Sequence, residues 1–346
     1  MRSRDLVDLV ALGFLWGASF LFMRIAGPEF GAFALVEVRV VIAALVLLPM
    51  LLARGQGSEL TANWIPLGIL GIHNTALPFF LFTWATLYLS AGVSGIMNAT
   101  APIFAAVIAW AWLGEKLTIS RAAGLIVGTV GVWLLVGDKV GASMGNTTLA
   151  VIAALGGSFL YGIGGNFARR YASHIKPLAV ATGSQVGAAL VLLPVAVLTW
   201  PDTSISMTAW AAAIVMGLFS TALAYILYFR LIANTGPTNA ITVTYLIPLF
   251  AMLLGALVID EPITASMVLG CGVILLGTGR VRSSVSTPFG PLHLNAPFLL
   301  SLPFASPSVR LPVPLPMDNR LKGLILPWQG LVFDVYSNTF GTSNGT

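Results

Sequence analysis

Residues 102–118 read PIFAAVIAWAWLGEKLT and residues 248–264 read PLFAMLLGALVIDEPIT, so the chain contains two versions of one segment. Both versions begin with Pro-x-Phe-Ala, and both place a glutamate three residues before a final threonine. The second version begins 146 residues after the first. Recurrence at a fixed spacing is the signature of an internal repeat. The chain is therefore predicted to consist of two copies of one structural unit.

Weaker matches extend the repeat to both sides of these segments. They are Phe14-Leu15-Trp16-Gly17 with Phe159-Leu160-Tyr161-Gly162, Arg24 with Arg169, Gly71 with Gly217, and Thr75-Ala76-Leu77 with Thr221-Ala222-Leu223. The predicted units are residues 1–137 and 138–282. Residues 283–346 match neither unit and hold 9 of the 20 prolines. We expect this tail to be disordered or derived from an expression vector.

The composition places both units in a membrane. Of 346 residues, 57% are hydrophobic and only 8% are charged, whereas roughly 25% are charged in ordinary soluble domains. This excludes a soluble globular protein, a disordered chain and a coiled coil. The single cysteine, Cys271, excludes a disulfide framework and any multi-cysteine metal site. The basic residues form no patch interleaved with aromatic residues, so nucleic acid is not an expected partner.

Ten apolar runs are long enough to cross a bilayer as helices, since a span needs about 20 apolar residues. The predicted spans are 5–26, 33–53, 63–84, 91–112, 119–136, 147–169, 178–199, 208–231, 238–259 and 264–281. Lys and Arg are concentrated in every second loop between the predicted spans. Cytoplasmic loops of membrane proteins carry an excess of these residues. Both termini are therefore predicted to be cytoplasmic, with Lys139 alone among the basic residues in an outer loop.

Each predicted unit has five spans, and five is an odd number. The two units must therefore cross the membrane in opposite orientations, which places Glu115 inside and Glu261 outside. Inverted repeats of this kind are a recurrent transporter architecture, with the substrate site near the midplane between the repeats. The fold class is thus an all-α membrane protein of two inverted five-helix repeats.

The chain resembles the drug/metabolite transporter superfamily, and within it the EamA-type ten-helix members. The resemblance is carried by Phe14-Leu15-Trp16-Gly17-Ala18-Ser19-Phe20, Arg39 and the paired segments at 102–118 and 248–264. It implies export of small organic solutes, commonly amino acids, across the inner membrane. The chain also looks like the aromatic-amino-acid exporters of the YddG type. Ser184 stands in the second unit where the first has Arg39, which is a departure from the repeat.

Polar side chains inside apolar runs are costly in a bilayer, so they are candidates for substrate binding. These candidates are His73, Asn74, Asn98, Thr100 and Thr244. Interhelical hydrogen bonds are the structural alternative for each of them. No Asp or Glu falls at the centre of a predicted span, which leaves His73 and Glu37 as the candidates for proton coupling. We therefore expect facilitated transport by alternating access.

Aromatic side chains are the second group of candidates, because their rings stack on aromatic solutes and contact ammonium groups. Trp16, Phe79, Tyr161, Tyr225 and Tyr245 are predicted to line the cavity, with ordinary packing as the alternative. Pro102 and Pro248 are predicted to kink their helices, since proline removes a backbone donor.

Arg39 is predicted as a gate residue toward the outer end of the second span. It is expected either to form a structural pair or to capture a substrate carboxylate.

Two other functions remain as alternatives to a carrier. One is a passive channel. The other is a rhomboid-like serine protease, because Gly92-Val93-Ser94-Gly95 spells G-x-S-G, although a nucleophile needs a positioned base. No Walker loop, dinucleotide fingerprint or zinc-ligand spacing is present, so ATP-driven transport, a cofactor and a metal are not expected. The expected partners are a small-molecule substrate and the lipid bilayer.

Overall fold

The computed structural model describes residues 3–116, 118–136, 145–236 and 240–282, together with five short strands. The structure divides into two compact units that differ from the predicted repeat units. From here on, the first unit is Met1–Leu294, which contains both predicted repeats, and the second unit is Asn295–Thr346. The predicted boundary at 137/138 and Lys139 lie outside the described residues.

The first half of the chain forms seven α-helices and one π-helical segment. They are α1 (Ser3–Ala53), α2 (Gly57–Ala62), α3 (Trp64–Leu70), η1 (Gly71–Ala76), α4 (Leu77–Thr86), α5 (Ala91–Asn98), α6 (Ala101–Leu113) and α7 (Ile119–Val136). α1 contains a kink at Gly31, where φ is 71° and ψ is 167°. A positive φ is accessible to glycine at little cost. The kink separates the first two predicted spans.

The second half contains α-helices, one π-helical segment and one 3-10 segment. They are α8 (Asn146–Tyr171), α9 (Pro177–Leu198), α10 (Met207–Gly217), η2 (Leu218–Leu223), α11 (Ala224–Thr235), η3 (Ile241–Tyr245), α13 (Ile247–Ile259) and α14 (Ala265–Arg282). Two residue pairs follow as short strands, β1 (Ser286–Thr287) and β2 (Gly290–Pro291), which are antiparallel.

Among the described residues, eight helices are long and apolar enough to cross a membrane, and Ala265–Gly279 is a shorter apolar helix. α1 counts as one of the eight although it holds two predicted spans. In lipid, a backbone must satisfy its own hydrogen bonds, and helices do so within one segment. The predicted class, a helical membrane protein, is confirmed.

Four irregular segments interrupt these helices at positions related by the repeat. α5 ends at Asn98 and α6 begins at Ala101, directly before Pro102. In the other half, the 3-10 segment η3 precedes α13, whose second residue is Pro248. The π-helical segments η1 and η2 occupy the matched stretches that begin at or beside Gly71 and Gly217. π-helical turns occur frequently at functional sites.

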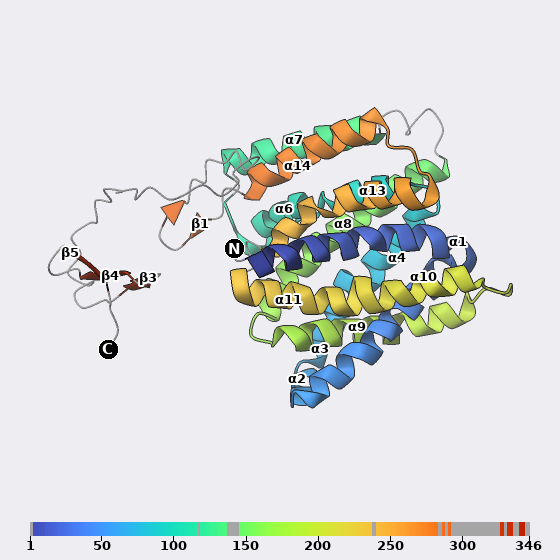
Figure 1. Cartoon of the computed structure of the whole chain (residues 1–346), viewed down its shortest axis with the longest axis horizontal. Coiled ribbons are helices and arrows are strands. Elements are labelled where there is room, and N and C mark those ends of the chain that lie inside the picture. The colour runs from blue at the N-terminus through green and yellow to red at the C-terminus, as the bar shows by residue number, and fades with distance from the viewer. Residues whose placement is uncertain are drawn as a thin grey trace. The chain divides into compact units, whose positions relative to one another are not determined.

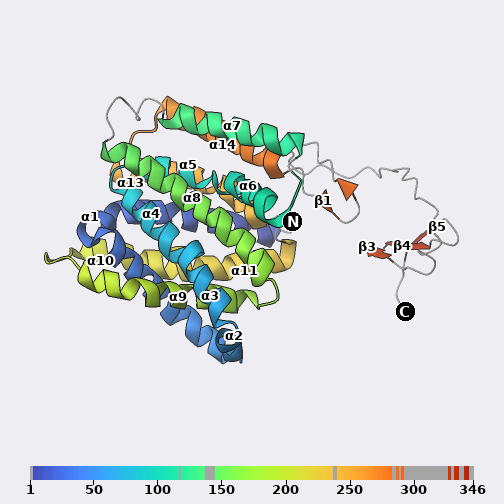
Figure 2. The same ribbon diagram turned by 180° about the vertical axis from the view of Figure 1, so that it is seen from behind.

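α1 lies in the interior of the first unit, where it contacts α4, α9, α10, α11 and α13 (Figure 1). α7 and α14 run side by side in both views (Figures 1 and 2). The two helices approach so closely that a Cβ atom added at Gly277 would lie 2.5 Å from the backbone nitrogen of Gly128. Small residues permit this close helix packing in membranes.

The second unit contains an antiparallel sheet of three strands, β3 (Leu326–Trp328), β4 (Leu331–Asp334) and β5 (Thr339–Thr342). Leu331 of β4 pairs with Trp328 of β3 and with Thr342 of β5. These strands fall in the tail that is predicted to be disordered or vector-derived. The other residues of the second unit lie outside the described residues.

Candidate functional site

A cavity of about 290 Å³ lies between helices that come from both halves of the first unit. From the first half, α1, η1, α4, α5 and α6 contribute to its wall. From the second half, α8, η2, α11, η3 and α13 contribute. Concave sites with apolar walls and a few polar groups are where small molecules bind. The cavity is therefore the candidate substrate site.

The aromatic part of the wall is made of seven side chains, namely Trp16, Phe20, Phe79, Phe82, Tyr161, Tyr225 and Tyr228. The rings of Trp16 and Tyr228 have their centroids 5.3 Å apart, and those of Phe82 and Tyr161 are stacked at 5.9 Å. Such pairs stabilise one another beyond their burial. They hold the rings in place around the empty space, where a planar or apolar solute can pack against them.

Four polar residues of the wall lie in the irregular segments or at their edges. Asn74 lies in η1 and Ser220 in η2, at matched positions of the repeat. Asn98 ends α5, and Thr244 lies in η3. Interrupted helices can present backbone and side-chain polar groups to a cavity, where regular helices would cover them. The wall thus combines aromatic faces with a few hydrogen-bonding groups.

Arg39 is the charged residue in the described cavity wall, and its side chain is buried, with 3% of the residue exposed. Its Nε donates a hydrogen bond to Thr221 Oγ1 at 2.8 Å. Its guanidinium carbon lies 3.7 Å from the centroid of the Phe79 ring, which is a cation–π distance. Arg39 lies eight residues past the kink at Gly31, which is about 12 Å along the helix.

Four predicted residues do not line the cavity. His73 Nδ1 lies 3.2 Å from the carbonyl oxygen of Ile69, and the Thr100 hydroxyl donates to the carbonyl of Met97. Tyr245 directs its hydroxyl toward Gly279 of α14, and Pro248 is buried near Gly95. Neighbouring residues of a helical segment point in different directions around its axis. For that reason Asn74 faces the cavity while His73 does not.

The remaining predicted residues, namely Trp16, Asn74, Phe79, Asn98, Tyr161, Tyr225, Thr244, Pro102 and Arg39, all line the cavity. Sequence reasoning missed Ser19, Phe20, Met23 and Phe82. Helical spacing could have found them, because residues at i, i+3, i+4 and i+7 share one face. Trp16 is followed at these spacings by Ser19, Phe20 and Met23.

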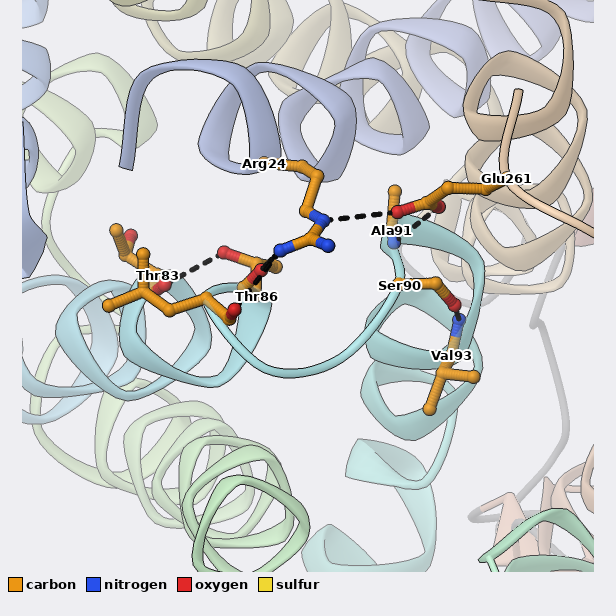
Figure 3. Close-up of polar contacts among 8 residues, drawn as sticks. Arg24, Thr83, Thr86, Ser90, Ala91, Val93 and Glu261 are labelled. Atoms are coloured by element: carbon orange, nitrogen blue, oxygen red, sulfur yellow. Dashed lines mark hydrogen bonds and ion pairs between the residues drawn. The ribbon is translucent and has the colours of Figure 1, made fainter. Parts of the chain in front are cut away.

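An ion pair joins α1 to the end of α13, as Figure 3 shows. Arg24 Nε donates to Glu261 Oε1 at 3.2 Å, and Arg24 Nη1 donates to the carbonyls of Thr86 and Leu87 at 3.0 Å each. Glu261 Oε2 also accepts a hydrogen bond from the backbone nitrogen of Ala91 at 2.8 Å. The Arg24–Glu261 pair therefore connects α1 to the end of α4, the start of α5 and the end of α13.

Glu115, the counterpart of Glu261, follows the end of α6. Its carboxylate accepts hydrogen bonds from Arg121, at 2.9 Å, and from Arg169 of α8. Burial raises the pKa of the Glu115 carboxyl, but the two arginines outweigh burial and hold that pKa below its ordinary value. The carboxylate is therefore charged at neutral pH and connects α7 and α8 to the end of α6.

Ser94, the serine of the G-x-S-G string, is fully buried in α5. Its hydroxyl has no hydrogen-bond partner among the described residues. His174 lies elsewhere, where its Nε2 is 3.2 Å from Asn63 Oδ1. A serine nucleophile requires a base within hydrogen-bond reach. The described geometry therefore gives no support to a protease.

Comparison with known proteins assigns the two halves to one family model. Residues 7–137 and residues 148–281 each match the EamA-like transporter family. The resemblance seen in the paired segments is confirmed.

Several relatives are named as transporters. The uncharacterized transporter YvbV of Bacillus subtilis (strain 168) is 24% identical over 280 residues, covering 79% of this chain and 90% of that protein. The uncharacterized inner membrane transporter YedA of Escherichia coli (strain K12) is 24% identical over 282 residues, covering 80% and 90%. One crystal structure, described only as that of a protein, has the same fold with a TM-score of 0.58. It is 19% identical and covers 81% of this chain and 98% of that one.

Proposed function

The chain belongs to the EamA-like transporter family, and from this premise we propose that it exports small metabolites, foremost aromatic or other neutral amino acids. It is a multi-pass protein of the plasma membrane and a transporter rather than an enzyme. The observation that carries the proposal is the cavity, which aromatic rings, two asparagines and one arginine line between the two halves. Aromatic faces and amide groups suit the ring and the polar backbone groups of such amino acids.

The proposed architecture is ten spans arranged as two inverted repeats. The kink at Gly31 divides α1 into two spans, and α14 supplies the tenth. The matched irregular segments η1 and η2 support the repeat, and so do the matched helix breaks before Pro102 and Pro248. Inverted repeats that rock about a central site give alternating access.

The proposed mode is facilitated transport rather than ATP-driven transport. No Asp or Glu belongs to the described wall of the cavity, and His73 bonds to its own helix outside that wall. Proton-coupled carriers place titratable groups along the substrate path. The solute gradient is therefore the proposed driving force.

Transport by purified protein in liposomes tests this proposal. We expect saturable uptake of phenylalanine that shows counterflow and does not require a pH gradient. Trp16→Ala, in the cavity wall, should reduce the uptake at least fivefold, since the substrate loses one aromatic face. Trp133→Ala is the matched control, because Trp133 is 69% exposed on α7 and should leave uptake within twofold of the wild type.

Two outcomes would contradict the proposal. If no amino acid enters faster than it enters protein-free liposomes, the substrate class is wrong. If uptake rises linearly with concentration and shows no counterflow, the protein is a passive channel rather than a carrier.

A further inference from the structure

The charge of Arg39 is not neutralised within the described part of the chain. Arg39 forms no ion pair there, and its Nη1 is buried without a hydrogen-bond partner. Glu37, two residues earlier on the same helix, does not share its face. The cavity wall thus holds one cation and, among the described residues, no anion.

The surroundings of Arg39 stabilise this charge only in part. Thr221 accepts one hydrogen bond, and the Phe79 ring lies under the guanidinium. Neither group carries a negative charge. An arginine within the membrane is costly, so such residues face cavities and mark ligand sites. An anion that enters the cavity would supply the missing partner.

We propose that Arg39 binds the carboxylate of the transported substrate in this central cavity. The inference rests on the proposed transport function. It adds that every transported substrate carries a carboxylate. A guanidinium matches a carboxylate by donating parallel hydrogen bonds, and the pair is stronger than a neutral one. Nε is bonded to Thr221 and Nη1 has no partner among the described residues, so we expect the ligand to bind at the Nη edge of the guanidinium.

The asymmetry of the repeat limits the ligand to one carboxylate. Ser184 stands at the position matched to Arg39, and its hydroxyl donates to the carbonyl of Ala181 in its own helix. A single guanidinium balances a single negative charge, whereas a phosphate dianion would remain undercompensated. The ligand is therefore a monocarboxylate with an apolar or aromatic body.

The residues of the wall also indicate which group of the ligand, the carboxylate or the ammonium group, contributes more to binding. No described carboxylate lines the cavity to pair with an ammonium group, which leaves Asn74, Asn98, Thr244 and the aromatic faces. These groups are weaker partners than a charged one. The carboxylate is accordingly required for binding and the ammonium group is not.

Three solutes with the same ring separate these contributions: phenylalanine, phenethylamine, which lacks the carboxylate, and 3-phenylpropionate, which lacks the ammonium group. Binding is measured as the increase in melting temperature of the purified full chain in detergent, so it does not depend on transport. The two carboxylates should raise the melting temperature, and phenethylamine should not. If phenethylamine stabilises the protein as much as the carboxylates do, the inference is overturned.

Variants of Arg39 provide the second measurement. Arg39→Gln should weaken binding of both carboxylates at least tenfold, and Arg39→Lys should restore part of it because the charge returns. Without ligand, Arg39→Gln should melt at or above the wild-type temperature, since an uncompensated charge is removed. A merely structural Arg39 would instead show a lower melting temperature and equal effects on all three solutes.

Liposome uptake of the same solutes distinguishes this inference from the proposed function. Carboxylates that bind through Arg39 but do not cross the membrane would contradict transport of these solutes and support the binding site. Phenylalanine that is transported equally well by Arg39→Gln would support the carrier and overturn the role of Arg39.

Discussion

Glu261 and Glu115 occupy the same position in two related segments, but they are held in different ways. Ala91, which donates to Glu261, begins the candidate span Ala91–Leu113, and Glu115 follows its end. A helical span of 23 residues is about 35 Å long at about 1.5 Å per residue. The two carboxylates therefore lie at opposite ends of one span.

Each carboxylate has one arginine from the other half of the chain, and these arginines are themselves matched, Arg24 with Arg169. The second partner differs. Glu261 accepts from the backbone of Ala91, whereas Glu115 accepts from Arg121, whose matched residue is Met267. The comparison teaches that the repeat preserves one ion pair at each end, while the local surroundings determine the second contact.

The largest effect is expected at the Glu261 end. Glu261 has 13% of its side chain exposed, and it joins Arg24 to the start of α5. Glu261→Ala removes both hydrogen bonds and should lower the free energy of unfolding by about 2 kcal/mol, since each bond involves a charged group. Thermal unfolding in detergent measures the change. Glu261→Gln is the control, because its amide oxygen still accepts from Ala91, and an equal loss in both variants would contradict this explanation.

Smaller losses of stability are expected when either arginine partner of Glu115 is replaced, and the two losses should differ. The side chain of Arg121 is 10% exposed and that of Arg169 is 65% exposed. Arg121→Ala should cost about 1 kcal/mol, whereas Arg169→Ala should cost at most about 0.5 kcal/mol, because exposed ion pairs contribute little. Thermal unfolding of the two variants side by side tests the order. If Arg169→Ala lost more stability than Arg121→Ala, the ion pair between Arg169 and Glu115 would stabilise the fold more than the buried pair does.

The smallest effect is a dependence of stability on acid. Because the two arginines lower the folded pKa of Glu115, its contribution is complete above the ordinary glutamate pKa of about 4.3. That contribution is lost as the pH falls from there through the folded pKa. Melting temperatures measured from about pH 6 to about pH 3.5 should therefore fall more in the wild type than in Glu115→Gln. Identical slopes would show that the carboxylate does not stabilise the fold.

Much of the cavity was predictable from the sequence. Trp16, Asn74, Tyr161 and Tyr225 stood out because aromatic and amide groups within apolar spans are unusual, and all four line the cavity. Helical spacing would have added the neighbours of Trp16. The rotational position of each helix was not predictable, because apolar spans lack the polar face that indicates which side is buried. For that reason the sequence did not indicate that the cavity wall includes Asn74 and Thr244 but not His73 and Tyr245.

The amino-acid sequence was sufficient to predict a helical membrane protein with two matched segments and a resemblance to the EamA-type transporters. The length of the apolar segments, the low number of charges and the matched segments can be read from the sequence without any knowledge of helix packing. Which side chains meet depends on the tertiary structure. It brought Arg39 beside Phe79 and Thr221, and it brought Arg24 to Glu261, 237 residues away along the chain. Such contacts depend on helix rotation, kinks and close approach, which sequence spacing does not specify.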